Sequence, residues 1–587
     1  MCGIVGILNK NKKITLSTKS ICKNMLQMIS YRGPDENKVL NHNDFSCGVT
    51  RLAIESVING EQPLENDKYI AGFNGEIFNY KDLKKKYLND PKDLNSDTKV
   101  LSRLYEKFGL SILKELNGFF SIAIYDKIKN KIFLVRDRFG IKPLYYYYKN
   151  NKLYFSSELN PLRKNLNYSK NDLNLKQVNN FFTLGYVLGE DRIFKDIKML
   201  DPASLIEFDL KKQKIKYSKW FDIKKIQNLY FENKNQLLNN LQEKINNAVN
   251  LWTRSDVDKV FCLSGGLDSS LLASTYASQN KKINTVSFVY EQKDKYKMWN
   301  ESSNSDLIAK KINSNHEKYF WSANDFKKDI YDIVQSLEEP FGNSILPWFI
   351  YKKVKKTFKV CITGNGGDEL FGNYLRVEKY KSYKGDFYNK KNFKNNYFYK
   401  NYYFNRIYQK KFLNMKNKDI SEAFFKLLLK NKSKIDKNRN LALLDYQGQF
   451  KDDQLFSEDK MSMRNSVEVR APFLDKDLFN FVYSLKKQRT NEKDYKYLVK
   501  ELAKTKIPIK VLNSKKKGFN MPISLFMREN FLSEVSYFLS KKNLKKYGFI
   551  KENFYEDLVV PMLNGDNKNI QIIWNVLIFH VWISLIR

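Results

Sequence analysis

The sequence predicts two folds in succession: an α+β domain with packed antiparallel sheets, followed by an α/β domain with a doubly wound parallel sheet and a helical C-terminal part. Short strands separated by turns fill the chain up to about Asp209. From about Gln236, apolar strands alternate with helices instead. A Lys- and Asn-rich segment joins the two patterns, so we expect domains over 2–210 and 236–587 and a connector over 211–235.

The N-terminal domain is expected to combine sheets with two helices. Segments such as GFFSIAIYD and KIFLVRD are rich in β-branched and aromatic residues, which is typical of strands. Helical stretches interrupt them near Ser17–Ile29 and Thr98–Phe108. This mixture predicts helices packed on antiparallel sheets.

The second domain repeats one unit: an apolar strand, a glycine turn and a helix. After a helix predicted over Leu237–Trp252, the strand KVFCL leads into SGGLDSSLLASTYA, and FKVCITGNGGDELFG has the same order. Turns that follow parallel strands lie at the same edge of the sheet. Open sheets bind ligands in the crevice at that edge, so we expect both turns to face one crevice.

The first glycine turn has the composition of a phosphate site. In Ser264, Gly265 and Gly266, small side chains let backbone N–H groups approach an anion, and the next helix adds its positive end. The lysine of a Walker loop is absent. Because Asp268 would repel phosphate, it implies an intervening Mg²⁺, which we expect Asp268 and Asp368 to share.

Composition and charge limit the remaining classes of function. The 587 residues contain five scattered cysteines, which predict neither a zinc site nor a disulfide framework and fit a reducing cytoplasm. No signal peptide is visible, and polar residues interrupt the apolar stretch IQIIWNVLIFHVWISLIR, so we expect a buried helix and no membrane span. The net charge of +39 favours a polyanion partner, but the lysines are dispersed without a nucleic-acid-binding motif, so no specific nucleic acid is expected.

The opening MCGIVGI places a cysteine directly after the initiator methionine. Removal of Met1 would leave Cys2 with a thiol and a free α-amino group. The amine can then act as a base for its own side chain, as it does in N-terminal nucleophiles. The competing interpretation of Cys2 is a small buried hydrophobe.

Several motifs together resemble a known family. SGGLDSS is similar to the pyrophosphate loop of the ATP pyrophosphatase superfamily. EDKMSMRNSVEVRAPFLD (Glu458–Asp475) and LNSKKKGFNMP (Leu512–Pro522) resemble later signatures of glutamine-hydrolysing asparagine synthetases. The N-terminal domain, led by MCGIVGI, resembles class II glutamine amidotransferases, which have the N-terminal nucleophile (Ntn, αββα) fold. The resemblance covers nearly the whole chain.

The resemblance implies roles for residues of the first domain. Cys2 would attack the glutamine side-chain amide, and Asn74 and Gly75 would stabilise the oxyanion. Arg51 would hold the substrate carboxylate, and Glu76 and Asp97 would lie near its ammonium group. The competing interpretations are a solvated strand residue for Arg51 and an ordinary Asn-Gly turn at 74–75.

The resemblance also implies the nucleotide contacts of the second domain. ATP would meet the first loop, a neighbouring strand end and the second loop, at Leu263, Ser264, Gly265, Gly266, Asp268, Ser269, Val286, Ser287, Thr363 and Gly364. Lys516 would meet the pyrophosphate, with Lys517 as its main rival. The implied cofactors are ATP and Mg²⁺, and the ammonia would cross between the sites through a sheltered channel.

Two positions depart from the family pattern. Asparagine synthetases commonly have a glutamate in the second glycine loop, where Asn365 stands, and an amide is no base near neutral pH. Trp348 occupies a place where small or hydroxyl residues are usual. We therefore expect amidation of aspartate, with another carboxylate such as a sugar acid as the alternative acceptor, in a cytoplasmic enzyme that could form a homodimer. The sequence also leaves open a basic nucleic-acid-binding protein and a degenerate synthetase that keeps only glutaminase activity.

Overall fold

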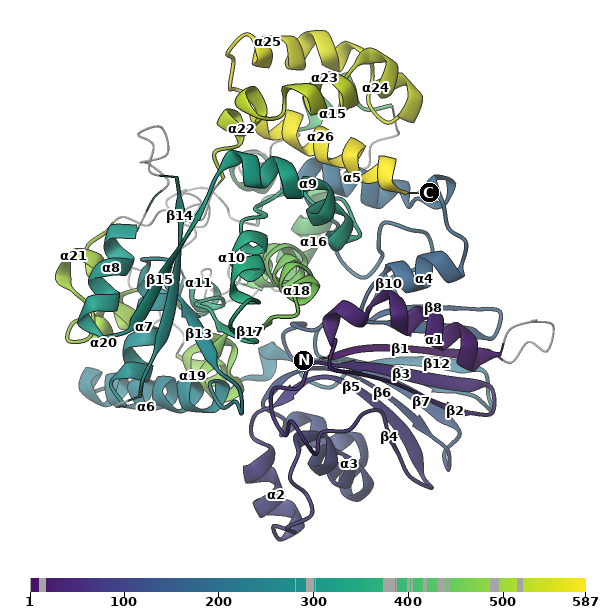
Figure 1. The fold of residues 1–587 in the computed structure, drawn as a ribbon, viewed down its shortest axis with the longest axis vertical. Coiled ribbons are helices and arrows are strands. Elements are labelled where there is room, and N and C mark those ends of the chain that lie inside the picture. Colours follow the sequence, from purple (N-terminus) through teal and green to yellow (C-terminus); the bar gives the residue numbers. More distant parts are fainter. Residues whose placement is uncertain are drawn as a thin grey trace.

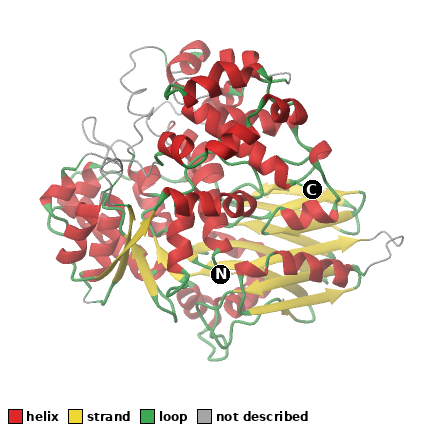
Figure 2. Ribbon diagram, turned by 45° about the horizontal axis from the view of Figure 1, so that its top comes forward, coloured by secondary structure: helices red, strands yellow, loops and turns green. Residues whose placement is uncertain are grey.

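The computed structural model describes residues 2–9, 17–279, 281–291, 300, 302–372, 386, 388–398, 402, 405–414, 420–430, 440, 443–485, 496–514 and 521–586. These residues form an N-terminal domain with two stacked sheets, a parallel sheet with helices on both faces, and a C-terminal group of helices (Figure 1). Figure 2 shows the long strands of the N-terminal domain side by side on the right, with a large group of helices above them and further helices on the left.

Two antiparallel sheets form the centre of the N-terminal domain. The first contains, in spatial order, β10 (Lys198–Met199), β8 (Tyr145–Lys149), β9 (Lys152–Ser156), β1 (Cys2–Asn9), β3 (Phe45–Arg51) and β2 (Glu36–His42). The second contains β12 (Lys214–Lys219), β11 (Ser204–Asp209), β7 (Lys131–Arg136), β6 (Gly118–Asp126), β5 (Tyr69–Ile77) and β4 (Leu64–Glu65). Apolar side chains of both sheets, including Ile4, Val49 and Ala123, share one buried cluster, so the sheets pack face to face.

Helices cover the outer faces of both sheets and complete an αββα arrangement. On the first sheet lie α1 (Thr18–Met28) and α4 (Asn160–Asn165), and on the second lie α2 (Tyr80–Leu88) and α3 (Asp97–Phe108). The side chain of Ser17 caps α1 by accepting a hydrogen bond from the N–H of Ser20 at 3.2 Å. The layers confirm the predicted Ntn fold of this half.

A five-stranded, entirely parallel sheet organises the second half. Its spatial order is β15 (Asn315–Trp321), β14 (Asn284–Tyr290), β13 (Lys259–Cys262), β16 (Val360–Ile362) and β17 (Glu468–Arg470). The chain first builds the sheet from β13 outward to β15 and then returns to the other side of β13. The order therefore reverses between β13 and β16, which is where doubly wound sheets bind ligands.

Each face of this sheet is buried under a different group of helices. Phe261, Val360 and Ile362 belong to an apolar cluster with α6 (Lys234–Trp252), α7 (Leu267–Ala277), α19 (Lys476–Ser484) and α20 (Tyr497–Ala503). Val260 and Cys361 belong to a second cluster with α9 (Ala323–Leu337), α10 (Pro347–Val354) and α18 (Leu455–Arg464). Since adjacent residues of a strand point to opposite faces, the residues of β13 and β16 that lie between the two helix layers are apolar on both faces.

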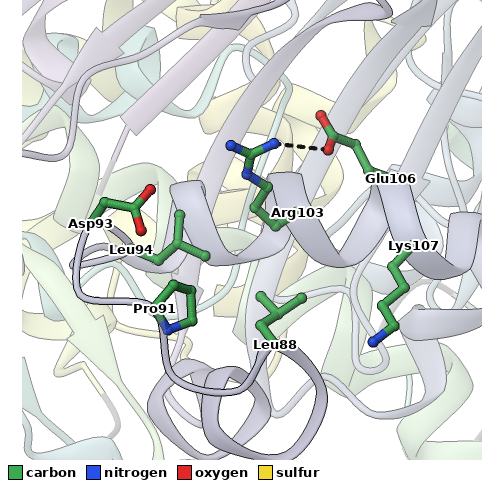
Figure 3. Close-up of a pocket in the computed structure, with 7 residues that line it drawn as sticks. All are labelled: Leu88, Pro91, Asp93, Leu94, Arg103, Glu106 and Lys107. Atoms are coloured by element: carbon green, nitrogen blue, oxygen red, sulfur yellow. Dashed lines mark hydrogen bonds and ion pairs between the residues drawn. The ribbon is translucent and has the colours of Figure 1, made fainter.

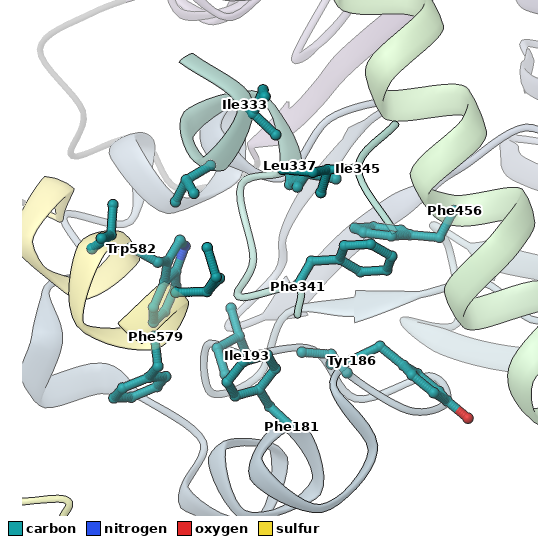
Figure 4. Packing of buried hydrophobic residues seen from close by; sticks show 14 of the residues in the cluster. Phe181, Tyr186, Ile193, Ile333, Leu337, Phe341, Ile345, Phe456, Phe579 and Trp582 are labelled. Carbon is teal, nitrogen blue, oxygen red and sulfur yellow. The ribbon is translucent and has the colours of Figure 1, made fainter. Parts of the chain in front are cut away.

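The C-terminal helices extend the second of these clusters. They are α15 (Arg406–Phe412), α16 (Ser421–Lys430), α22 (Ile523–Glu529), α23 (Leu532–Phe538), α24 (Lys541–Tyr547), α25 (Val560–Leu563) and α26 (Ile570–Leu585), and α5 (Leu175–Leu184) of the first half packs with them. The first cluster instead receives α8 (Ser302–Lys311), α11 (Gly367–Phe371) and α21 (Ile509–Leu512), and the short α13 (Lys390–Asn392) has no buried residue. Figure 4 shows Phe579 and Trp582 of α26 packed near Ile193 and Leu337. In the described part of the chain, no helix is both long enough and apolar enough to cross a membrane.

Two local expectations need correction. The segment 211–235 contains an edge strand, β12, which pairs with β11, and so it is more than a connector. Ile215 is half-buried and the other side chains of β12 are exposed, which leaves no apolar alternation for the sequence to show. Val286 and Ser287 do not end their strand either, because β14 continues to Tyr290. They lie instead beside the end of the shorter β13.

Candidate active site

The two glycine turns meet at the topological switch of the parallel sheet. The first joins β13 to α7, and the second joins β16 to α11. A methyl group on Gly364 would lie 2.9 Å from the backbone N of Ser269, and one on Gly367 would lie 2.8 Å from Cγ of Asp268. The turns are therefore in direct contact, and the absence of side chains on these glycines allows that contact.

The first turn is tightened by its own serines. The N–H of Gly266 donates to Oγ of Ser264 at 3.2 Å, and this hydroxyl lies 3.0 Å from Oγ of Ser269. Gly265 has a φ of 78°, which favours glycine. Gly266 is the N-cap of α7, so the first N–H groups of that helix open toward the turn.

Backbone hydrogen bonds join both turns to neighbouring strands. Leu263 donates to the carbonyl of Val286 at 2.8 Å, and Thr363 donates to the carbonyl of Arg470 at 2.9 Å. The first bond brings Val286 next to the turn, and Ser287 follows it with a hydroxyl 3.1 Å from Nε2 of His316. The structure thus gathers the predicted ATP-contacting residues of both turns and of β14 in one region.

Lys496 places a positive charge between the two predicted metal-binding carboxylates. Its ammonium group contacts Asp268 and lies 2.7 Å from Oδ1 of Asp368. Burial disfavours the charge on this ammonium, yet the two aspartates hold its pKa above the usual value. Asp268 and Asp368 therefore converge on one ammonium group, that of Lys496, which was not predicted; the Mg²⁺ that they were expected to share stays a prediction.

Nothing local singles out Lys496 in the sequence. It is one of 103 Lys and Arg residues and lies 228 positions from Asp268. The predicted phosphate lysine, Lys516, and its rival Lys517 fall outside the described residues.

A glutamate that the sequence did not single out faces the second turn. The carboxylate of Glu458 on α18 accepts hydrogen bonds from the hydroxyl of Tyr351 and from the side chain of Asn365. Burial raises the pKa of Glu458 to about 7, although these two hydrogen bonds oppose the rise. A carboxylate therefore stands one hydrogen bond away from the loop position where family members commonly have one.

Trp348 has a structural explanation. It is buried on α10, and its indole N–H donates to Oδ2 of Asp329 on α9 at 3.0 Å. Lys352, one turn further along α10, contacts the same carboxylate at 2.6 Å. The indole therefore takes part in packing α10 against α9, with its polar atom satisfied.

The second candidate site surrounds Cys2 at the start of β1. Cys2 is buried, its N–H lies 3.3 Å from Oδ1 of Asn74, and the Gln62 side chain donates to its Sγ at 3.6 Å. Burial raises the pKa of the Cys2 thiol to about 11. A thiol in this state is protonated near neutral pH, so nucleophilic attack requires a base beside it.

Asn74 and Gly75 lie inside β5, which excludes a simple turn at this Asn-Gly pair. A methyl group on Gly75 would lie 2.0 Å from the carbonyl oxygen of Phe119 on β6, so this close strand pairing requires glycine. The amide Nδ2 of Asn74 faces the hydroxyls of Ser121 and Ser157, at 3.4 and 3.2 Å. Asn74 therefore contacts Cys2 through its Oδ1, while its Nδ2 donates to the two serine hydroxyls.

Arg51 is directly opposite Cys2 in the pairing of β1 with β3. Its side chain is only 4% exposed, which excludes a solvated strand residue. The guanidinium donates to Glu36 and to the carbonyls of Ser56 and Val57 at 2.7 to 3.1 Å. These contacts hold the guanidinium of Arg51 in place, and its binding of a substrate carboxylate stays a prediction.

Three carboxyl groups, those of Glu76, Asp97 and the half-buried Glu55, lie close enough to interact with one another, and Glu76 also acts on the Cys2 thiol. Burial raises the pKa of Asp97 to about 6 and that of Glu55 to about 7, and it holds the pKa of Glu76 well above its usual value. Asp97 also accepts the N–H of Ile77 at 3.1 Å. A cation would stabilise their charged forms, which suits the ammonium group of an amino-acid substrate.

Helix α18 connects the two sites through ion pairs. Asp459, next to Glu458, accepts from Arg32 at 2.8 Å and from Lys142 at 2.9 Å. Arg32 in turn donates from Nε to the carbonyl of Cys2 at 3.3 Å. Burial opposes the charge on Asp459, but Arg32 and Lys142 hold the pKa of this carboxyl well below its usual range.

The hollow shown in Figure 3 lies on the outer layer of the N-terminal domain. It is lined by Leu88, Pro91, Asp93, Leu94, Arg103, Glu106 and Lys107. The Arg103 guanidinium pairs with Glu106 at 3.1 Å, and no predicted site residue is among those that line the hollow. We assign no chemistry to it.

Comparisons with known proteins agree with this two-site arrangement. A family model described as a glutamine amidotransferase domain matches residues 1–221, and one described as asparagine synthase matches residues 240–584. The second match alone covers more than half of the chain. The chain belongs to the asparagine synthase family. It is a glutamine-dependent carbon–nitrogen ligase, and its family uses ATP.

Individual relatives extend the likeness over the full length. Asparagine synthetase (glutamine-hydrolyzing) 1 of Bacillus subtilis is 28% identical, with 100% of this chain and 97% of the relative aligned. A putative asparagine synthetase (glutamine-hydrolyzing) 2 of Methanocaldococcus jannaschii is 31% identical, over 66% of this chain and 78% of its own. Among solved structures, a glutamine phosphoribosylpyrophosphate amidotransferase from B. subtilis is 16% identical over 48% of this chain and 65% of its own, with a TM-score of 0.28.

Proposed function

We propose that this family member is a glutamine-hydrolysing asparagine synthetase. It would convert glutamine, aspartate, ATP and water into glutamate, asparagine, AMP and pyrophosphate. The observation that carries the proposal is the contact of the two glycine turns, with Asp268, Asp368 and Lys496 between them, in the same chain as the Cys2 site. The proposal includes a domain division at 2–210, 211–235 and 236–587, in which the middle segment contributes the edge strand β12 to the first domain before it connects to the second.

In the first half-reaction, the thiolate of Cys2 attacks the side-chain carbonyl carbon of glutamine. The C–N bond breaks, ammonia leaves, and water hydrolyses the thioester to glutamate. Because the pKa of the thiol is about 11, the proton must be removed during the attack. We assign this task to the α-amine of Cys2 after removal of Met1. Arg51 would hold the substrate carboxylate, and Glu76 and Asp97 its ammonium group.

In the second half-reaction, a carboxylate oxygen of the acceptor attacks the α-phosphate of ATP and pyrophosphate leaves. Ammonia then attacks the acyl-adenylate and AMP leaves. The N–H of Gly265 and the first N–H groups of α7 would bind phosphate oxygens, while the N–H groups of Ser264 and Gly266 hold the shape of the turn through the serine hydroxyls. Lys496, and Lys516 as the resemblance implies, would offset the negative charge of the phosphates.

The chemistry of the donor set fits Mg²⁺. Asp268 and Asp368 already converge on one cation, the ammonium of Lys496. In the described part of the chain, no cluster of three or more His, Cys, Asp or Glu side chains could hold a metal by itself. Two carboxylates that rely on phosphate oxygens and water for the other ligands suit Mg²⁺. When bound with ATP, the ion would neutralise phosphate charge.

The identity of the acceptor carboxylate is the most specific part of the proposal. Aspartate is favoured by the family, while Asn365 in the second turn favours the alternative of another carboxylate, such as a sugar acid. A screen that measures AMP with glutamine, Mg-ATP and single acceptors separates the two. AMP release that depends on a sugar acid and not on aspartate would contradict asparagine synthesis. Glutamate release without AMP for any acceptor would indicate a glutaminase only. Gel filtration of the same protein preparation tests whether the chain forms the proposed homodimer.

A further inference from the structure

Asn365 supplies no carboxylate at its position in the second turn, and the structure shows the carboxylate of another residue beside that position. Glu458 reaches the turn from α18, a helix 93 positions further along the chain. The Asn365 side chain and the Tyr351 hydroxyl both donate to its carboxylate, which holds the group next to the turn. The residue is half-buried, so it is not sealed inside the core.

We propose that Glu458 is the proton acceptor of the amide-forming step and replaces the loop carboxylate that Asn365 cannot supply. This inference rests on the proposed function. When ammonia attacks the carbonyl carbon of the acyl-adenylate, the new nitrogen has one proton too many and a positive charge. Glu458 takes that proton, the C–O bond to AMP breaks, and AMP leaves with the bond electrons. The products are a neutral amide, AMP and the protonated carboxyl of Glu458.

The surroundings of Glu458 suit this task. Burial raises its pKa to about 7, and a general base works best when its pKa is near the working pH. The charged or titratable groups that face it come from several elements: Tyr351 from α10, Cys262 from β13, Cys361 from β16, Lys142 from the segment after β7, and Asp459 from α18 itself. Tyr351 and Lys142 favour the carboxylate, and Asp459 opposes it.

Two half-reactions separate this role from binding. Acceptor-dependent exchange of labelled pyrophosphate into ATP reports adenylation, and amide formation with ammonium chloride reports the later step without the Cys2 site. For Glu458→Gln we expect amide formation at saturating ammonia to fall about 10²-fold. Pyrophosphate exchange should change less than threefold. Glu243→Gln is the matched control, because Glu243 is exposed on α6, and it should behave as wild type.

The pH profile of ammonia-dependent turnover tests the proton itself. In the wild type, the rate at saturating ammonia should fall tenfold per pH unit below about 7, because Glu458 is then protonated. Tyr351→Phe removes a hydrogen bond that lowers this pKa, so the fall should begin at a higher pH. A combined Glu458→Gln and Asn365→Glu variant should regain at least tenfold of the lost amide formation, since it returns a carboxylate to the turn.

The outcomes are distinct. Absence of pyrophosphate exchange in the wild type with every acceptor would overturn the proposed function, and this inference with it. A second outcome is a wild type that adenylates the acceptor while Glu458→Gln still forms the amide at the wild-type rate, or still loses rate below about pH 7. In either case the inference is wrong and the proposed function stands. Loss of exchange in folded Glu458→Gln would also overturn it, because Glu458 would then serve substrate binding.

Discussion

Replacement of Asp459 by asparagine tests whether α18 holds the two domains together. Asp459 is nearly completely buried and accepts three hydrogen bonds: two from Arg32, at 2.8 and 3.2 Å, and one from Lys142, at 2.9 Å. Both donors come from the N-terminal domain. Asp459→Asn keeps the shape and one acceptor oxygen, but it leaves two buried cations with less negative charge nearby.

The size of the effect follows from the burial of the pair. Removal of one partner of a buried ion pair costs about 3–5 kcal/mol, and we take about 3 kcal/mol because asparagine still accepts a hydrogen bond. For a cooperative unit of roughly 350 residues, this loss lowers the unfolding midpoint by about 4 °C. Arg32 also donates to the carbonyl of Cys2, so a displaced guanidinium should slow glutamine hydrolysis about tenfold.

Calorimetry and a glutamate-release assay measure the two effects on the same preparation. Asp477→Asn is the matched control, since the Asp477 side chain is 62% exposed and its lysine partner lies 3.9 Å away. We expect the control to match the wild type in both assays. A wild-type midpoint together with wild-type glutamine hydrolysis in Asp459→Asn would refute the interdomain role of this ion pair.

Three further predictions address the sites themselves. Cys2→Ala should abolish glutamine-dependent synthesis and leave ammonia-dependent synthesis within about twofold, because only glutamine hydrolysis uses the thiol; loss of both activities in folded protein would contradict this. Asp268→Asn should lower pyrophosphate release at least about tenfold with either nitrogen source, and equal release would show that Asp268 does not serve ATP. Gly75→Ala should cost about 3 kcal/mol of stability, because its methyl group would lie 2.0 Å from the Phe119 carbonyl oxygen, and an unchanged unfolding midpoint would disprove that.

The features that sequence reasoning found are local ones. Strand–glycine–helix units, with Asp268 and Asp368 at fixed offsets, can be read directly because each turn needs its glycines within a few residues of the strand end. The position of Cys2 and the alternation of strands in the first half are local in the same sense. The edge strand β12 was missed because its exposed lysines remove the apolar alternation that marks a strand.

The chain by itself therefore determined the two folds, their order, and the turns that carry the phosphate chemistry. Only the tertiary structure decided which side chains complete them. Lys496 reaches Asp268 across 228 positions, and Glu458 reaches Tyr351 across 107. Such contacts depend on how distant elements pack, and no local spacing encodes that packing. Among the 103 basic residues, Lys142 and Lys460 are also buried against carboxylates, so only the identity of the two aspartates that the fold brings to Lys496 distinguishes it.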